Sequence, residues 1–311
     1  MKILLTGASS FTGTWFAKAL REAGHEVVAT LRAGAAEYSG LRGERIRLLR
    51  DLGVIFLEQC SFGDDSFINQ LHDGVEIVCH HAAQVSNYKS LDFDVLGAVR
   101  DNTLNVRSVL NAGREAGVKA FVVTGSVFEQ DEGLGNAPLR AFSPYGLSKG
   151  LTWKTFEYWS EQLAVPVHKF VIPNPFGPME EPRFCAHLLQ KWSRGEVAQV
   201  GTPAYIRDNI HVSLLAAAYR DFVRRGAQST ISLKSGPSGY VESQGAFARR
   251  FAREIGDRLS VRAELDFVNQ TDFPEPRMRI NADRLDSAAL GWSEASAWDG
   301  LAAYYRATYL G

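Results

Sequence analysis

The stretch KILLTGASSFTG (Lys2–Gly13) decides the fold. Its apolar run Ile3–Leu5 predicts a buried strand, and Gly7 allows the tight turn that leads from a strand into a helix. Gly13 lets that helix pack closely on the strand, as in turns that hold a pyrophosphate at a helix N-terminus. Ser10 stands where a middle glycine is expected; its hydroxyl can bind phosphate, although its Cβ limits backbone approach. The stretch predicts a dinucleotide-binding turn, and a glycine-containing turn without a ligand is the alternative.

Short apolar runs alternate with helical patterns through the first half of the chain. This alternation predicts βαβ units and an α/β fold with a doubly wound parallel sheet, the Rossmann fold. The expected strands are Ile3–Leu5, Val27–Leu31, Val54–Leu57, Ile77–Cys79, Phe121–Val123 and Val165–Val171. The clearest expected helices are Thr14–Ala23, Leu91–Ala116 and Tyr145–Leu163.

The composition changes after Ile172. The proline-rich segment Pro173–Pro182 predicts a loop, and the elements after it predict a smaller domain. We expect a Rossmann domain over 1–172, with return elements at about 206–235, and a C-terminal substrate-binding domain over 173–205 and 236–311. The later expected elements are a helix over 184–194, a short segment over 207–213, a helix over 214–224, and a final helix over 297–309 capped by Ser296 rather than Ser293.

Composition and charge exclude several classes of protein. With 34 basic and 35 acidic residues, the net charge is −1, which does not indicate binding to nucleic acid or to a membrane surface. Three cysteines without CxxC spacing fit neither a disulfide framework nor a zinc site. The opening apolar run is too short for a signal peptide, and no segment is long enough to span a bilayer. We expect a cytoplasmic protein with no metal site and with neither nucleic acid nor membrane as a partner.

A second cofactor signal follows the second expected strand, in ATLR (Ala29–Arg32). Sites that prefer NAD place an acidic residue about 20 residues after the glycine turn, where it holds the ribose 2′-OH. This region has no acid and carries Arg32, whose guanidinium suits the 2′-phosphate of NADP. The sequence therefore favours NADP(H), with NAD(H) possible, and a solvated surface arginine is the alternative.

The catalytic signal is YGLSK (Tyr145–Lys149). Residues i and i+4 share one face of a helix, so the Lys149 ammonium can lower the phenol pKa of Tyr145 from about 10 toward working pH. A phenol in that range is a usable acid and base, and the same ammonium can reach the nicotinamide ribose. An exposed helical pair is the alternative, but the position after the fifth expected strand favours catalysis.

With these motifs the sequence resembles the extended short-chain dehydrogenases/reductases over essentially its whole length. This family contains NAD(P)-dependent nucleotide-sugar epimerases, dehydratases and reductases. The resemblance implies that Thr124, in VVTGSVF (Val122–Phe128), hydrogen-bonds the reacting sugar oxygen beside Tyr145; Ser126 is a near alternative. It also implies a role for Asn102, on a long fourth helix, in a proton relay. A strand-end cap is the alternative for the threonine, and a satisfied core amide for the asparagine.

The resemblance extends to the substrate side and implies a nucleotide-diphosphate sugar as substrate. Asn174, in PNPFGP, resembles an asparagine that contacts the substrate. Arg207, in RDNIHV, and Arg277 stand where arginines of the family bind the diphosphate. The departures from the family pattern are Ser10 in place of a glycine, Phe128 in place of a tyrosine, and Cys60 in place of an aspartate that contacts adenine.

Several functions fit these motifs. The favoured one is an NADPH-dependent reductase of a nucleotide-linked 4-keto-6-deoxyhexose, with hydride transfer to C4 and Tyr145 as the acid, as in surface-polysaccharide pathways. Arg32 favours it because a net reduction draws on NADPH. The alternative is an NAD-dependent nucleotide-sugar 4-epimerase. A 4,6-dehydratase is disfavoured because Gly-Ser follows Thr124 where such enzymes place Asp-Glu. A non-catalytic NADP-binding regulator conflicts with the intact threonine, tyrosine and lysine set.

The expected site residues fall into three groups. The catalytic ones are Thr124, Tyr145, Lys149 and Asn102. The cofactor-binding ones are Gly7, Ser9, Ser10, Phe11, Thr12, Gly13, Arg32, Ala82, Tyr145 and Lys149. The substrate-binding ones are Ser126, Asn174, Arg207 and Arg277. The resemblance also implies a homodimer formed by the two long helices over 91–116 and 145–163, with Trp153, Phe156 and Trp159 partly at the interface.

Overall fold

The computed structural model describes residues 1–88 and 90–310, and its contacts divide the chain into two compact units. Unit 1 comprises Met1–Glu132, Leu139–Ile172 and Ala216–Gly236. Unit 2 comprises Gly133–Pro138, Pro173–Leu215 and Pro237–Gly311. The chain returns to unit 1 at Ala216, later than the expected 206, because the strand at 206–211 pairs with strands of unit 2.

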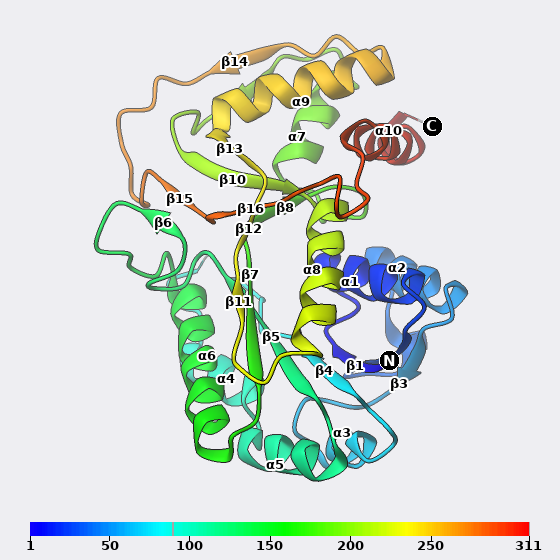
Figure 1. Ribbon diagram of the computed structural model, residues 1–311. Coiled ribbons are helices and arrows are strands. Elements are labelled where there is room, and N and C mark those ends of the chain that lie inside the picture. The colour runs from blue at the N-terminus through cyan, green and yellow to red at the C-terminus, as the bar shows by residue number, and fades with distance from the viewer. Residues whose placement is uncertain (89, 311) are drawn as a thin grey trace. The chain divides into compact units, whose positions relative to one another are not determined.

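Unit 1 is built on a seven-stranded sheet in the order β11-β7-β5-β4-β1-β2-β3 (Figure 1). Every strand pair in it is parallel. The strands are β1 (Lys2–Thr6), β2 (Glu26–Thr30), β3 (Ile55–Leu57), β4 (Ile77–His80), β5 (Ala120–Ser126), β7 (Val167–Ile172) and β11 (Lys234–Ser235). The expected doubly wound α/β fold is confirmed. Because the strand order reverses at β1, the carboxyl ends of β1 and β4 flank the switch point where such sheets bind ligands.

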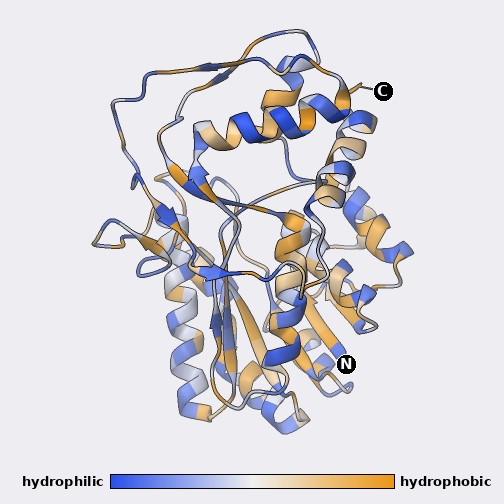
Figure 2. Ribbon diagram, turned by 45° about the horizontal axis from the view of Figure 1, so that its top comes forward, coloured by the Kyte–Doolittle hydropathy of each residue, from blue (hydrophilic) through white to orange (hydrophobic). Residues whose placement is uncertain are grey.

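Helices cover both faces of this sheet. They are α1 (Phe11–Glu22), α2 (Gly40–Asp51), α3 (Asp65–Leu71), α4 (Val95–Asn102), α5 (Val106–Ala116), α6 (Pro144–Leu163) and the part of α8 (Val212–Gly226) that belongs to unit 1. Val167 of β7 packs in one core cluster with residues of α3, α5 and α6. Phe170, three residues on, faces the opposite side and contacts Phe16 of α1 and Tyr219 of α8. The apolar colouring of the strands in Figure 2 matches their burial between these layers.

The expected helix over 91–116 is wrong in two respects: it begins at Val95, and it is two helices, α4 and α5. The break falls at Asn105, which has a left-handed φ of 50°. Its side-chain Nδ2 donates to the carbonyl oxygen of Gly63 at 2.9 Å. Asparagine tolerates this backbone conformation better than most residues, so a single tertiary hydrogen bond is enough to interrupt the helical pattern.

Unit 2 consists of short strands and helices around an aromatic core. Its strands form the sheet β13-β10-β8 and the pairs β12-β16, β14-β9 and β15-β6. The strands are β6 (Leu134–Gly135), β8 (Asn174–Phe176), β9 (Ala198–Val200), β10 (Ile206–His211), β12 (Pro237–Ser238), β13 (Tyr240–Ser243), β14 (Leu265–Phe267), β15 (Arg279–Ile280) and β16 (Asp283–Arg284). The helices are α7 (Phe184–Trp192), α9 (Gln244–Leu259) and α10 (Glu294–Tyr305). Phe176, Trp192, Phe251, Trp298 and Tyr305 lie in its core.

Two expectations for unit 2 are wrong. The segment over 173–182 is not entirely a loop, because β8 pairs in parallel with β10 and buries Phe176. The last helix begins three residues earlier than expected, at Glu294, and Ser293 is its cap: the Ser293 hydroxyl accepts the N–H of Ser296 at 3.3 Å. A serine three residues before a backbone N–H satisfies one of the open donors of the first turn.

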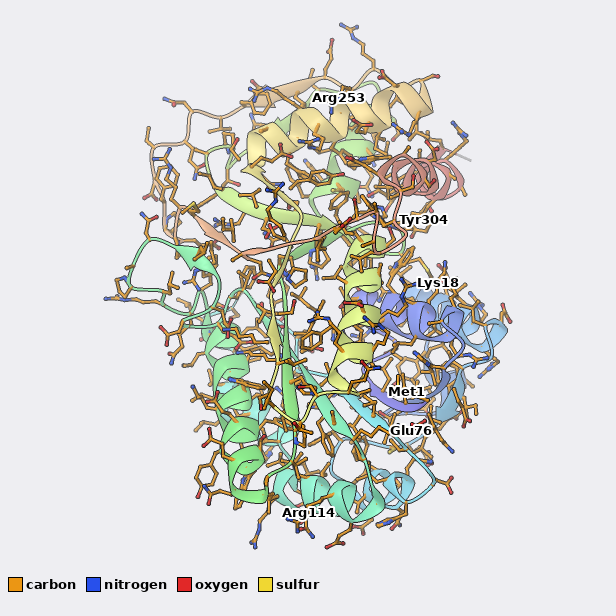
Figure 3. All side chains as sticks on the ribbon, in the orientation of Figure 1. Met1, Lys18, Glu76, Arg114, Arg253 and Tyr304 are labelled. Atoms are coloured by element: carbon orange, nitrogen blue, oxygen red, sulfur yellow. The ribbon has the colours of Figure 1, made fainter. Side chains whose placement is uncertain are left out.

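The start of β1 is held by charged groups at the surface. Met1 and Glu76 lie close together (Figure 3), with the α-amino group 3.8 Å from the Glu76 carboxylate. Lys119 donates to the same carboxylate at 2.5 Å and lowers its pKa.

No helix within 1–88 and 90–310 is long and apolar enough to cross a membrane.

Candidate active site

The glycine turn after β1 is closed too tightly for side chains. A Cβ on Gly7, which has a φ of +78°, would lie 2.7 Å from the backbone nitrogen of Ala82. A Cβ on Gly13 would lie 2.1 Å from the carbonyl oxygen of Gly7. The Ser10 hydroxyl donates to Gly7 at 2.8 Å and accepts the N–H of Gly13 at 3.2 Å. The serine thus replaces a glycine without opening the turn, because its hydroxyl caps α1.

Helix α1 begins at Phe11, so the N–H groups of Phe11 and Thr12 are its first. Such N–H groups at a helix N-terminus can bind a pyrophosphate. The Thr12 hydroxyl lies 2.9 Å from Nε2 of His81, and the Ser10 hydroxyl lies 3.2 Å from the same atom. Burial and the charge of Lys149 lower the His81 pKa to about 3, so this imidazole is neutral. Sequence reasoning missed His81; its position directly after β4, at the switch point, was the available signal.

Arg32 and Arg45, which both follow β2, differ in burial. Arg32 lies just past the end of the strand and its side chain is exposed. Arg45 of α2 is fully buried and donates to the carbonyl oxygen of Ser9 at 3.3 Å. It places a buried positive charge beside the glycine turn. No sequence pattern distinguishes Arg45 from the other arginines of that helix.

Helix α6 carries Tyr145 and Lys149, and its first turn is held by a side-chain cap and a close backbone contact. Ser143 caps it by accepting the N–H of Gly146 at 3.3 Å, and a Cβ on Gly146 would lie 2.2 Å from the carbonyl oxygen of Phe128. One turn later, Lys149 is buried and its Nζ donates to the carbonyl oxygen of Thr124 at 2.5 Å. Burial lowers the Lys149 pKa to about 8. The ammonium is therefore held at the end of β5 and titrates near working pH.

Thr124 lies within β5 rather than on the loop after it. Its side-chain hydroxyl is buried beside the Tyr219 phenol, but no hydrogen bond of good geometry satisfies it among the residues that the structure describes. The hydroxyl of Ser126, by contrast, accepts the N–H of Phe128 at 3.2 Å. An unsatisfied buried hydroxyl costs free energy, so the Thr124 side chain is the better placed of the two to meet a ligand oxygen.

Aromatic rings surround Tyr145. The rings of Tyr88 and Phe93 approach it edge-on, with centroids at 5.8 Å and 6.0 Å. Edge-to-face contacts of this kind restrict the orientation of a phenol ring. The sequence did not identify these two residues, because they lie in an irregular segment without periodicity.

Asn102 is almost fully buried and has the contacts of a core amide. Its side-chain Nδ2 donates to the hydroxyl of Thr152 at 3.3 Å, and its backbone carbonyl oxygen lies 3.0 Å from Nε2 of His80. These bonds tie the end of α4 to α6 and β4. The bond to Thr152 agrees with the alternative expected for this residue, a core amide, and its role in a proton relay stays a prediction.

Of the expected substrate-binding residues of unit 2, Arg207 lines a cavity of about 600 Å³. Its lining includes Phe184, Thr202, Tyr205, Arg207, Gln244 and Glu275. The Arg207 guanidinium pairs with the Glu275 carboxylate at 3.0 Å and also donates to the carbonyl oxygens of Pro276 and Arg277. Asn174 lies in β8, opposite Asn209 of β10.

Arg277, in the same segment as Glu275, has a different environment from Arg207. Its side chain is exposed, and its guanidinium carbon lies 5.1 Å from the centroid of the Phe273 ring.

Within 1–88 and 90–310, no group of three or more His, Cys, Asp or Glu side chains is placed to hold a metal ion.

The model of the NAD dependent epimerase/dehydratase family matches residues 3–231. The chain belongs to this family. It is therefore an enzyme of the extended short-chain dehydrogenase/reductase type, as the resemblance implied. The turn, the buried Thr124 hydroxyl and the lysine of α6 lie in the matched part of this family member.

Three proteins illustrate what this family member is similar to. The low-salt glycan biosynthesis protein Agl12 of Haloferax volcanii is 25% identical over 323 residues, which cover 97% of each chain. The UDP-glucose 4-epimerase of Thermotoga maritima, solved with UDP-glucose, is 20% identical, with a TM-score of 0.71 over 99% of both chains. The UDP-glucuronic acid 4-epimerase of Bacillus cereus, solved with UDP-glucuronic acid and NAD, is 18% identical, with a TM-score of 0.72 over 99% of this chain and 100% of the other. The two structural likenesses show a shared fold.

Proposed function

We propose that this enzyme is a 4-epimerase of a nucleotide-diphosphate sugar. The observation that carries the proposal is the buried Thr124 hydroxyl without a partner, beside the Lys149 ammonium and on the same unit as Tyr145. Similar proteins described as UDP-glucose and UDP-glucuronic acid 4-epimerases support this function, expected above as the alternative, over the reductase expected first.

The residues of the glycine turn fit a dinucleotide. The cradle formed by Gly7 and Gly13 excludes any Cβ, and the N–H groups of Phe11 and Thr12 together with buried Arg45 would hold the pyrophosphate. When bound, the nicotinamide would accept a hydride from the sugar C4 and return it to the opposite face.

The proton follows a path through the residues of α6 and β5. Tyr145 would remove the proton from the sugar O4 as its phenolate, and would return it in the second half of the reaction. The Lys149 ammonium favours that phenolate, since a positive charge nearby stabilises the ionised form. Thr124 would donate its unused hydroxyl to O4 and orient it.

The nucleotide diphosphate would occupy the cavity of unit 2. Arg207 supplies the positive charge there, and Tyr205 and Phe184 supply aromatic surface. Asn174 and Arg277 stay candidates for substrate contacts. We further expect NAD(H) as the cofactor on the similarity to epimerases solved with NAD, whereas the preference for NADP(H) rests on Arg32 and the missing acid near it.

The test begins with the dinucleotide that the purified protein retains, identified after denaturation. The protein is then incubated with UDP-glucose, UDP-galactose and UDP-glucuronic acid, and the C4 epimers are followed by proton NMR. We expect interconversion without net change in NADH. Absence of any epimer across the panel, with cofactor bound, would contradict the proposal.

A second function is favoured by one observation. Arg32 is exposed just past β2, where a 2′-phosphate would be bound, so a reductase of a nucleotide 4-keto-6-deoxyhexose is the other candidate. Stoichiometric consumption of NADPH with such a ketosugar would identify it.

A further inference from the structure

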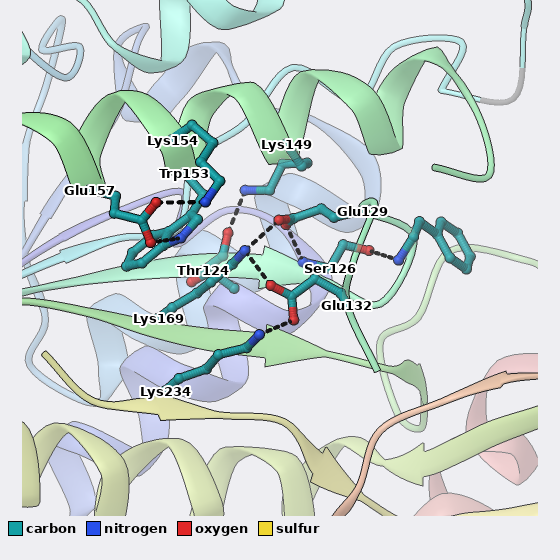
Figure 4. A network of polar contacts seen from close by, with 11 residues as sticks. Thr124, Ser126, Glu129, Glu132, Lys149, Trp153, Lys154, Glu157, Lys169 and Lys234 are labelled. Carbon is teal, nitrogen blue, oxygen red and sulfur yellow. Dashed lines mark hydrogen bonds and ion pairs between the residues drawn. The ribbon is translucent and has the colours of Figure 1, made fainter. Parts of the chain in front are cut away.

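A buried network of charges lies beneath the end of β5 (Figure 4). The Lys169 ammonium of β7 donates to Glu129 and to Glu132, both at 2.6 Å. All three side chains are at most 5% exposed. Glu132 is paired further with Lys234, at 2.7 Å. Charges this deeply buried are retained only when each has a partner, so the network is a fixed feature of unit 1.

The network touches the backbone that carries Thr124. Glu129 accepts the N–H of Ser126 at 2.7 Å through the oxygen that does not bind Lys169. A Cβ on Gly125 would lie 2.7 Å from Cε of Lys169 and 2.9 Å from Oε1 of Glu129. The glycine after Thr124 therefore leaves room for the ion pair against the strand.

We propose that Glu129 is a positioning residue, which fixes the end of β5 around Thr124 and keeps the neighbouring Lys149 protonated. It does not touch the reacting atoms in this assignment. It acts through the lysine, whose charge Tyr145 needs. The proposal rests on the assigned roles of Tyr145 and Lys149.

The charges around Lys149 support this assignment. Burial lowers the lysine pKa to about 8, Glu129 opposes that shift, and Lys169 adds to it. His80 and His81 also face the ammonium from β4, but burial lowers both their pKa values to about 3, so they are neutral. Glu129 is thus the carboxylate that opposes loss of the proton from Lys149.

Glu132 offers a matched comparison. It accepts from the same Lys169 ammonium at the same distance, yet its second oxygen faces Lys234 rather than Ser126. Removal of either carboxylate takes one partner from Lys169. Only the loss of Glu129 also removes a negative charge near Lys149 and the hydrogen bond to the Ser126 N–H at the end of the strand.

The test is the titration of Lys149 in Glu129→Gln, with Glu132→Gln as control. Lysine is labelled with ¹³C at Cε, and the Lys149 resonance is assigned by its absence in Lys149→Arg. We expect the titration midpoint of Lys149 to fall by about one pH unit in Glu129→Gln, the lower end of the effect of a nearby opposite charge. Glu132→Gln should move it much less. An unchanged midpoint in Glu129→Gln, or equal shifts in both variants, would overturn the proposal.

A second variant covers the case in which Glu129→Gln fails to fold. Lys169→Met removes the positive charge that opposes Lys149, so the midpoint should rise; a fall or no change contradicts the assignment. Neither titration needs substrate or cofactor, so failure of the proposed epimerase leaves the result readable. If epimerase activity is found, the alkaline limb of kcat should move to lower pH in Glu129→Gln and not in Glu132→Gln.

Discussion

Thr124 and Lys149 are joined through the threonine's carbonyl oxygen, which accepts the lysine ammonium at 2.5 Å, while the threonine's hydroxyl is left without a partner. One residue thus serves two purposes: its backbone places the charge that Tyr145 needs, and its side chain is available to a sugar oxygen. Substitution of the side chain should separate them.

Thr124→Val should lower turnover while leaving cofactor affinity nearly unchanged. The variant keeps the carbonyl that holds Lys149 and removes a buried hydroxyl with no partner, so the free energy of unfolding should be unchanged or slightly higher. Thermal unfolding and steady-state kinetics check both parts. A clear loss of stability would show that the hydroxyl has a structural partner.

Tyr145→Phe should lower turnover by about 10²–10⁴-fold, the usual contribution of a general acid or base, and cofactor binding should survive. Lys149→Ala should damage both properties, because the ammonium serves the phenol and the ribose. Kinetics on a confirmed substrate, with cofactor affinity measured by calorimetry, tests the pair. Near-normal turnover in Tyr145→Phe would remove the tyrosine from the mechanism.

Arg32→Ala tests the preference between cofactors. If the guanidinium meets a 2′-phosphate, the variant should bind NADPH more weakly and NADH nearly as before. Dissociation constants for the two cofactors give the answer. Equal losses, or none, would leave Arg32 as a solvated surface residue and favour NAD(H).

The homodimer through the helices over 91–116 and 145–163 stays a prediction. Of the three aromatic residues expected partly at its interface, Trp153 and Trp159 are only partly buried and stay candidates. Phe156 is fully buried in the core of unit 1, whereas Leu151 of α6 is exposed. Leu151→Glu should therefore give a monomer, and Ile231→Glu, at another exposed apolar position of unit 1, should not. Light scattering at micromolar concentration measures the mass. A monomeric wild type would rule out the dimer.

Glu275→Gln should tighten the binding of UDP. The Glu275 carboxylate occupies the Arg207 guanidinium, and an incoming diphosphate has to displace it. Because Glu275 is more than half exposed, the ion pair is worth at most about 1 kcal/mol, so the gain should not exceed about fivefold. Asp272→Asn, on the lining of the same cavity, is the control for charge alone. Equal effects in the two variants would mean that the pairing with Arg207 is irrelevant.

Local patterns allowed the strands of unit 1 and the glycine turn to be predicted. Parallel strands buried on both faces leave continuous apolar runs, and a close helix-to-strand contact demands Gly13. The spacing of Tyr145 and Lys149 needed only the period of a helix. These features depend on residues within a few positions of one another.

The features that could not be predicted depend on partners distant in sequence. Asn105 interrupts a helix because of the carbonyl of Gly63, and Lys169 meets a carboxylate 40 residues away. Arg45 is one of several similar arginines until the fold buries it. The choice of reductase over epimerase relied mainly on Arg32 and on the missing acid near it, and a single exposed side chain is weak support for a reaction type.

The order in which the chain visits its two units decides how the protein can be cut and recombined. A fragment that stops at Ile172 would lack residues 216–236, so it would lose the edge strand β11 and uncover Phe16 and Phe170, on which Tyr219 packs. Such a fragment should expose the unpaired backbone edge of β7 and aggregate. Grafting a new substrate unit from another family member therefore requires crossovers at several junctions at once, and variation in specificity is more accessible through substitutions within the loops of unit 2 than through exchange of a contiguous block.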